Sequence, residues 1–145
     1  MTPTTATPRR CSIAGALDVI GEKWSLLVVR ELFLGVRRFN DIAANTGAPR
    51  DILTARLRRL EELGVIERRE YSERPPRYEY RLTATGKDLR PVIMALKQWG
   101  EDHVMAGPLP QVYEHTCGAV FRPQMHCAAC GEPDDPRDLT LVSAV

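Results

Sequence analysis

Residues 42–80 constrain the fold of this chain more than any other part of its sequence. Residues 45–49, Asn-Thr-Gly-Ala-Pro, predict a tight turn, because Asn and Gly permit positive φ and Pro suits a first helical turn. A stripe of leucines at helical spacing follows, and Gly64 ends it. The pattern therefore predicts a short helix, a sharp turn and a second helix over residues 50–63.

A β-hairpin is predicted directly after this second helix. Residues 65–71 and 77–82 alternate well enough to form two strands, and Pro75-Pro76 excludes a helix between them. Helices followed by a two-stranded hairpin make a winged helix-turn-helix. The expected fold is mainly α with a small β-hairpin wing.

Further helical spacing occurs on both sides of this unit, in residues 12–20, 24–34, 39–45 and 84–105. The second of these segments is almost apolar all round, so we expect it to be the central core helix and Trp24 to pack in the core. Pro91 lies inside the last segment and predicts a kink or a later helix start.

The composition changes along the chain and indicates three regions. We expect a disordered arm over residues 1–10, a winged helix-turn-helix DNA-binding and dimerisation domain over 11–106, and a Cys-containing C-terminal extension over 107–145. No apolar run approaches the roughly 20 residues that span a bilayer. Because the N-terminus also lacks the apolar core of a signal peptide, a cytoplasmic, nucleoid-associated protein without membrane contact is expected.

The charge of the chain is unevenly distributed, although its net value is only +1. Residues 37–81 hold 11 basic and 8 acidic residues, whereas residues 101–145 hold 2 basic and 7 acidic residues. Arginine predominates over lysine, and its planar guanidinium suits bidentate contacts to phosphate and guanine. The centre of the chain therefore fits double-stranded DNA; solvated helix faces are the alternative interpretation.

Three side chains of the 50–63 helix are predicted to reach base edges in a major groove. Arg50, Thr54 and Arg58 lie on or beside the face opposite the leucines. The alternative for each is simple solvation of a surface side chain.

Three more arginines are predicted to contact the DNA backbone or the minor groove. Arg74 and Arg77 flank the hairpin tip, and Arg38 stands just before a predicted helix. For Arg38 the alternative is an ion pair with Glu31 or Asp41. Backbone contacts would make binding weaken steeply with salt, whereas base contacts would give sequence preference.

An ordered set of motifs resembles the HxlR-type transcriptional regulators of the MarR-like superfamily. The motifs are Leu17-Asp18-Val19-Ile20-Gly21-Glu22-Lys23-Trp24, Arg30-Glu31-Leu32, Arg38-Phe39-Asn40-Asp41-Ile42, Leu60-Glu61-Glu62-Leu63-Gly64-Val65-Ile66-Glu67-Arg68 and Pro75-Pro76-Arg77-Tyr78-Glu79-Tyr80-Arg81-Leu82-Thr83. The resemblance implies a homodimeric DNA-binding regulator of a neighbouring promoter. Our specific expectation is a repressor of a neighbouring gene; activation is the alternative.

The last long helix gives a reason for two copies of the chain. It carries more apolar surface than so small a core can cover, and Trp99 is expected at a dimer seam. Pairing of the first and last helices across a two-fold axis would space two recognition helices about 34 Å apart, which suits a palindromic operator. By analogy, a small aromatic or phenolic effector would bind between the dimer helices and the DNA-binding lobe.

Cys11 stands near the start of the first predicted helix, where a helix N-terminus favours a reactive thiolate. Some relatives that this chain resembles sense oxidants or electrophiles through a cysteine at this place. A sensor role for Cys11 is therefore one hypothesis, and an inert, half-buried side chain is the other.

The C-terminal extension holds a Cys/His cluster that could bind a structural zinc ion. Cys127 and Cys130 form a C-x-x-C followed by glycine, Cys117 would be a third ligand, and His115 or His126 a fourth. A second C-x-x-C is missing, so a dithiol or an unmetallated tail is the alternative.

The main competing functions also rest on Cys127 and Cys130. They are a thiol redox protein and a zinc-bearing protein-interaction module. The sequence around them lacks the strand and helix that an oxidoreductase motif needs. With no nucleophile–base constellation and no phosphate loop, we expect no enzymatic activity.

Overall fold

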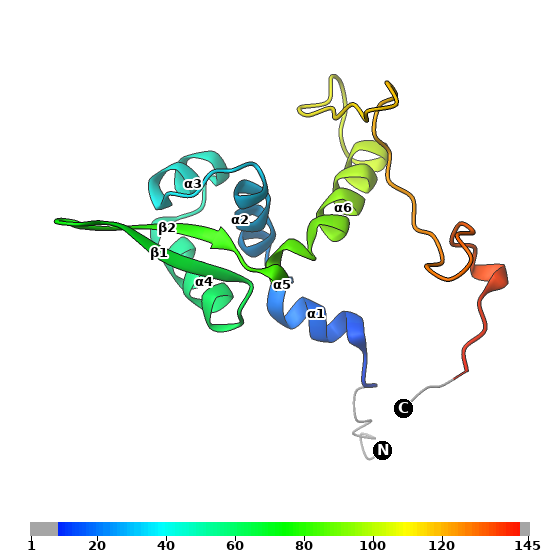
Figure 1. Cartoon of the computed structure of the whole chain (residues 1–145), viewed down its shortest axis with the longest axis horizontal. Helices are drawn as coiled ribbons and strands as arrows, with labels where there is room; N and C mark the ends of the chain where they lie inside the picture. The colour runs from blue at the N-terminus through cyan, green and yellow to red at the C-terminus, as the bar shows by residue number, and fades with distance from the viewer. Residues whose placement is uncertain (1–8, 143–145) are drawn as a thin grey trace, which may run out of the picture. The chain divides into compact units, whose positions relative to one another are not determined.

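The computed structural model describes residues 9–142, so most of the predicted arm at residues 1–10 lies outside the described residues. The chain divides into two compact units, one ending at Arg90 and the other beginning at Pro91. The elements of the first unit are α1 (Ser12–Ile20), α2 (Lys23–Phe33), α3 (Phe39–Thr46), α4 (Arg50–Glu62), β1 (Ile66–Glu73), β2 (Pro76–Leu82) and α5 (Ala84–Lys87) (Figure 1). Helix α6 (Arg90–His103) and the 3-10 turn η1 (Pro136–Asp138) follow.

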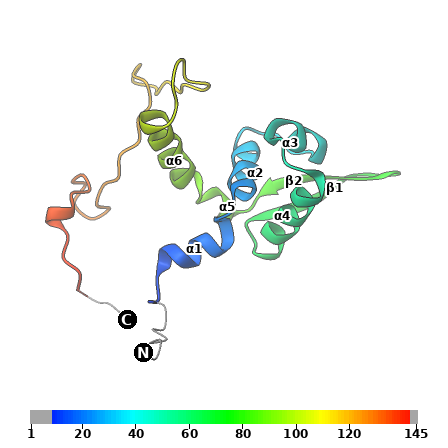
Figure 2. The same ribbon diagram turned by 180° about the vertical axis from the view of Figure 1, so that it is seen from behind.

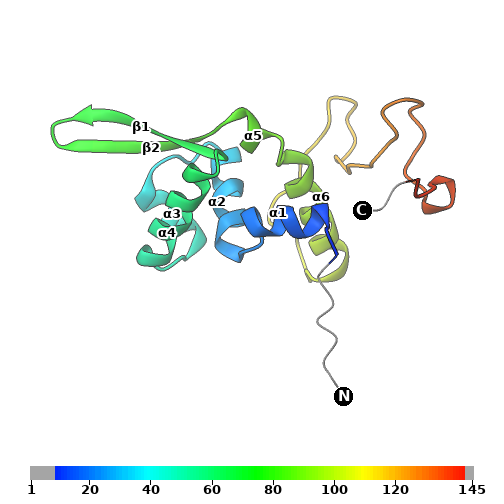
Figure 3. The ribbon, with the colours of Figure 1, turned by 90° about the horizontal axis from the view of Figure 1, so that it is seen from below.

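The first unit is the predicted winged helix-turn-helix. Helices α2, α3 and α4 lie together, and the antiparallel β1–β2 hairpin projects beyond them as the wing (Figures 2 and 3). The inner face of the helices is apolar and almost fully buried. The largest fully buried side chains of the core are Val28, Val29, Ile42, Leu53, Leu57 and Leu60 of the helices and Ile66 of β1. This core fixes the direction in which α4 presents its other face.

The helical segment predicted over residues 84–105 is divided, and the later helix start that Pro91 predicted is confirmed. The structure has a single turn, α5, and then α6, which begins at Arg90. Proline is accepted in the first turn of a helix, where its missing N–H leaves no bond unmade, but not in the interior. Pro91 therefore stands at the second position of α6 rather than inside a continuous helix. Because α6 belongs largely to the second unit, a joint domain over residues 11–106 stays a prediction.

Helix α2, which the sequence predicts to be almost apolar all round, also buries the carboxylate of Glu31. Arg30 donates to Glu31 Oε1 from Nε at 2.9 Å and from Nη2 at 2.7 Å, and Asn45 donates to Oε2 at 2.8 Å. A buried carboxylate is tolerated when it is paired and hydrogen-bonded in this way. Trp24 is only half-buried, so it is a smaller part of the core than expected.

The hairpin is joined to the helices along the second half of β2 and just beyond its end. The backbone N–H of Tyr80 donates to the carbonyl of Arg37 at 2.8 Å, just before α3. Beyond β2, Thr83 donates from its backbone N–H to the Val65 carbonyl at 3.1 Å, and its hydroxyl caps α5 by accepting from Gly86 N–H. These bonds hold the wing beside α3 and α4.

Candidate nucleic-acid interface

The outward face of α4 carries the three predicted base-reading residues. Arg50, Thr54 and Arg58 are all exposed, whereas Leu53 and Leu57 on the opposite face are buried. The Thr54 hydroxyl donates to the Arg50 carbonyl at 2.8 Å, which fixes its orientation along the helix. This face is therefore free to meet a partner, and it presents two guanidinium groups and one hydroxyl.

A groove lies between the beginning of α3, the first residue of α4 and the hairpin. We call it the arginine groove. Its lining residues are Arg38, Phe39, Asn40, Asp41, Arg50, Tyr71, Arg77 and Tyr78. Three of the six residues predicted to bind DNA thus come together in one place, from three different elements of the sequence. Thr54 and Arg58 lie further along α4, and Arg74 is exposed at the hairpin tip.

Two guanidinium groups of the arginine groove are held in place by neutral neighbours. Arg50 Nη2 donates to Asn40 Oδ1 at 2.9 Å, and the Arg50 Cζ lies 4.8 Å from the ring centroid of Phe39. The Cζ of Arg38 lies 4.6 Å from the ring centroid of Tyr71. Stacking on a ring orients a guanidinium while leaving its in-plane N–H groups available to phosphate oxygens.

The predicted DNA-binding arginines differ from their neighbours in their charge partners. Within residues 9–142, no carboxylate oxygen lies within 4.0 Å of the guanidinium of any of the five. Arg69 and Arg81 of the hairpin, by contrast, pair with Glu67 and Glu79, each at 2.6 Å. The ion pair considered for Arg38 is absent from the described part of the chain.

The arginines of the hairpin fall into two kinds, those that pair with a glutamate and those that do not. The hydrogen bond from Arg81, reinforced by the nearby charges of Arg81, Arg37 and Arg38, lowers the pKa of the Glu79 carboxyl, although partial desolvation opposes this. Arg68 stacks on Tyr78 at 4.4 Å and approaches Glu61 at 3.9 Å. The paired arginines contribute little net positive charge, whereas Arg74 and Arg77 have no ion-pair partner among residues 9–142.

The sequence did not reveal the aromatic walls of the groove. Tyr71 is the extra residue of a β-bulge, because Glu70 pairs with Tyr78 and Ser72 with Arg77. A bulge redirects one side chain out of the regular alternation. Tyr71 is thereby available to stack under Arg38, which simple alternation along the strand could not have indicated.

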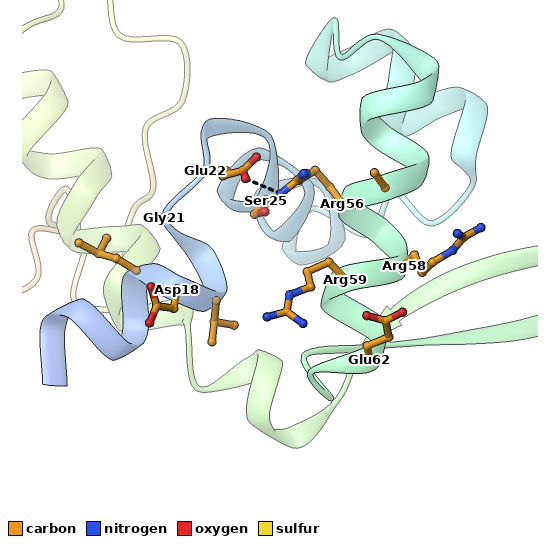
Figure 4. Close-up of a pocket in the computed structure, with 11 residues that line it drawn as sticks. Asp18, Gly21, Glu22, Ser25, Arg56, Arg58, Arg59 and Glu62 are labelled. Carbon is orange, nitrogen blue, oxygen red and sulfur yellow. Dashed lines mark ion pairs between the residues drawn. The ribbon is translucent and has the colours of Figure 1, made fainter.

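A second depression lies behind α4, against the end of α1 and the start of α2. Figure 4 shows Arg59 reaching into it and Arg56 forming an ion pair with Glu22 at 2.5 Å, while Arg58 extends from the other side of the helix. Ser25 is buried and also lines this depression, and the buried Arg56 Nε has no hydrogen-bond partner in the described chain. Unsatisfied polar groups at a surface hollow are suited to a small polar ligand.

The four cysteines are all exposed and free. Cys11 is the N-cap residue of α1, and its side chain makes no capping hydrogen bond. In the extension, Cys117 lies in a turn closed by a hydrogen bond from His115 N–H to the Ala119 carbonyl at 2.8 Å. Cys127 and Cys130 lie in a separate turn, between paired residues 126 and 133.

The predicted zinc ligands are not gathered at one point. Among residues 9–142, no group of three or more His, Cys, Asp or Glu side chains is arranged to hold a metal ion. Cys127 and Cys130 share one turn, and hydrogen bonds from the amides of Cys130 and Ala129 and from the Cys130 thiol lower the pKa of the Cys127 thiol. The four-ligand arrangement therefore does not fit this structure, and zinc binding stays a prediction.

The helices of the described region are all too short or too polar to cross a lipid bilayer.

Several known proteins are similar to this chain in sequence and in fold. Residues 19–108 match the model of a family described as HxlR-like helix-turn-helix. The chain is 46% identical over 131 residues to the HTH-type transcriptional regulator MT3179 of Mycobacterium tuberculosis (strain CDC 1551 / Oshkosh), covering 89% of this chain and 83% of that protein. The crystal structure of PA1607 superposes with a TM-score of 0.78 at 37% identity, over 90% of this chain and 93% of that one.

A redox regulator is also among the similar structures. HypR in its oxidized form superposes with a TM-score of 0.60 at 34% identity, over 66% of this chain and all of that one. The family match covers the helices and wing described above, and its members are DNA-binding transcription regulators rather than enzymes. The exposed α4 face, the arginine groove and the family match agree: the chain belongs to the HxlR family of winged helix-turn-helix transcriptional regulators.

Proposed function

We propose that this regulator binds a palindromic operator as a homodimer and represses a neighbouring gene. The observation that carries the proposal is the arginine groove, where three guanidinium groups lie beside the exposed face of α4 and have no carboxylate partner among residues 9–142. The N-terminal half of α4 would enter a major groove while the wing contacts the flanking backbone. A dimer on a promoter would block access of the polymerase.

Exposed apolar side chains support the homodimer. Ile13 and Leu17 of α1 are 71% and 56% exposed, and Leu96 and Trp99 of α6 are 49% and 59% exposed. Surfaces of this kind on helices are suited to burial against a second copy. Two chains bound per palindromic duplex, measured by analytical ultracentrifugation, is the expected stoichiometry, and one chain per duplex would contradict it.

Replacing Arg58 and Arg74 separately should distinguish base reading from backbone contact. Arg58→Ala is expected to cost about 1–3 kcal/mol on the operator and little on random DNA, because a lost base contact erodes preference. Arg74→Ala is expected to weaken binding to all sequences alike and to lower the slope of log K against log salt by about 1.

The two variants can be compared in gel shifts with DNA upstream of the chain's own gene and with a scrambled duplex. Each variant serves as the control for the other, since both remove one exposed positive charge. Equal losses on specific and random DNA for both variants would refute the assigned roles.

The signal that controls binding is proposed to be a small molecule in the depression behind α4. An aromatic or phenolic acid would place its carboxylate near Arg59 and the unsatisfied Nε of Arg56, close to the buried Ser25. A ligand there would touch the helix that carries Arg58. If 4-hydroxybenzoate, as a probe, neither binds in calorimetry nor weakens operator binding at millimolar concentration, this chemical class is excluded.

A redox signal through Cys11 is the second candidate for control. Cys11 is exposed at the beginning of α1, and the similar structure HypR is named a redox regulator. Operator binding that is unchanged by peroxide in the full chain would remove this candidate.

A further inference from the structure

Cys127 and Cys130 share one tight turn at the surface of the C-terminal extension, and the proposed DNA contacts do not use them. Gly131 N–H donates to the Cys127 carbonyl at 2.8 Å, and Cys127 N–H donates to the Glu132 carbonyl at 2.8 Å. Gly131 has a φ of +78°, a backbone conformation that residues with a Cβ atom rarely adopt. The turn therefore holds two exposed thiols in a defined arrangement.

The two cysteines are three residues apart in a turn that the Gly131 N–H closes by donating to the Cys127 carbonyl. Hydrogen bonds from the backbone amides of Cys130 and Ala129 and from the Cys130 thiol also lower the pKa of the Cys127 thiol. A disulfide requires two Cβ atoms about 3.5–4.5 Å apart, and two cysteines in so short a closed turn can meet that requirement with a small adjustment. The geometry is thus suited to joining the two sulfurs.

The same turn lacks the additional ligands that a zinc ion needs. His126 Nδ1 lies 3.0 Å from the Gly131 carbonyl, and His115 Nδ1 accepts from the Cys117 backbone N–H at 3.3 Å. In each ring it is Nδ1 that contacts the backbone, and no third His, Cys, Asp or Glu joins the cysteine pair within residues 9–142. A structural zinc site takes four ligands, so two thiols alone are better suited to exchange chemistry.

We propose that Cys127 and Cys130 form a reversible dithiol–disulfide couple that responds to low-molecular-weight disulfides. The Cys127 thiol, losing its proton, attacks one sulfur of the small disulfide, and the other half leaves as a thiol. The Cys130 thiol then attacks the Cys127 sulfur of this mixed disulfide, forms the Cys127–Cys130 bond and releases the second half as a thiol. In total, the protein gives up two electrons and two protons, and the small disulfide is reduced to two thiols.

The second step distinguishes this pair from the other cysteines. The resolving thiol is only three residues from the attacked sulfur in a closed turn, so its effective concentration is high. Cys11 stands outside the turn as the N-cap of α1, and Cys117 lies in the separate turn closed at His115, so both should stop at the mixed disulfide. This inference does not depend on DNA binding.

Mass spectrometry of the full chain tests the proposal. The reduced chain is treated with oxidised glutathione, alkylated and digested. We expect the wild-type peptide that contains Cys127 and Cys130 to escape alkylation and to weigh two hydrogen atoms less than the reduced peptide. Dithiothreitol should restore both thiols and the reduced mass. Cys130→Ser should instead accumulate the glutathione adduct on Cys127, about tenfold above the wild type. Cys117→Ser, the matched control, should behave like the wild type at this peptide.

Three results would overturn the proposal. The first is a wild-type chain that retains glutathione on Cys127 to the same extent as Cys130→Ser. The second is a disulfide between chains rather than within the turn, seen on a non-reducing gel. The third is one zinc ion per purified chain that protects both thiols from glutathione and is lost in Cys130→Ser.

Discussion

Replacing Leu57 by alanine is expected to lower the free energy of unfolding of the winged helix-turn-helix unit by about 2–5 kcal/mol. Leu57 is only 1% exposed and lies on the inner face of α4, between the equally buried Leu53 and Leu60. The neighbouring side chains cannot collapse fully into the space, so the variant loses both transfer free energy and packing contacts. Urea unfolding followed by circular dichroism measures the change.

A matched leucine tests whether burial is the cause. Leu34 ends α2 and is 43% exposed, so Leu34→Ala should change the free energy of unfolding by less than about 1 kcal/mol. If both substitutions had the same small effect, the inner face of α4 would not be the core of this unit. The orientation assigned to Arg50 and Arg58 on the outer face would then lose its basis.

The double variant Arg38→Ala/Arg77→Ala is expected to bind operator DNA about 100-fold more weakly than the wild type. Both guanidinium groups line the arginine groove and have no carboxylate partner within the described chain. Losing two charge-assisted contacts of about 1.4 kcal/mol each gives this factor. Fluorescence anisotropy with labelled operator, at one fixed salt concentration, measures the affinity.

The hairpin itself supplies the control for this variant. Arg68→Ala/Arg69→Ala removes the same amount of charge, but Arg68 approaches Glu61 and Arg69 pairs with Glu67. We expect a loss of less than about tenfold, because these arginines present little free charge. Equal losses for the two double variants would mean that total charge, rather than the arginine groove, determines affinity.

The architecture could be predicted because its signals are local. The leucine stripe of α4 and the turn before it follow from spacing and from residues that favour turns, and both are present in the structure. The late start of α6 beside Pro91 is also local in origin. The sequence permits either a kink or a later start, and the choice depends on which turn the proline enters.

Features that depend on distant partners could not be predicted. Burial of Glu31 depends on Asn45, 14 residues away, and a charge in an apolar segment does not reveal such a partner. The placement of Tyr71 depends on a shift in strand register, which the alternation of the strands does not encode. The sequence indicated the DNA-binding arginines through their number and their positions. It could not indicate which of them form ion pairs, because that depends on where each glutamate lies in the folded chain.

The most direct test of the central claim is methylation interference with dimethyl sulfate on an operator selected from random duplexes. This reagent modifies guanine N7 in the major groove and adenine N3 in the minor groove, so one experiment reports on both grooves. If α4 enters the major groove and two copies bind, methylated guanines should block binding in two clusters about 34 Å apart. Interference at adenines alone, or none at any guanine, would contradict the account.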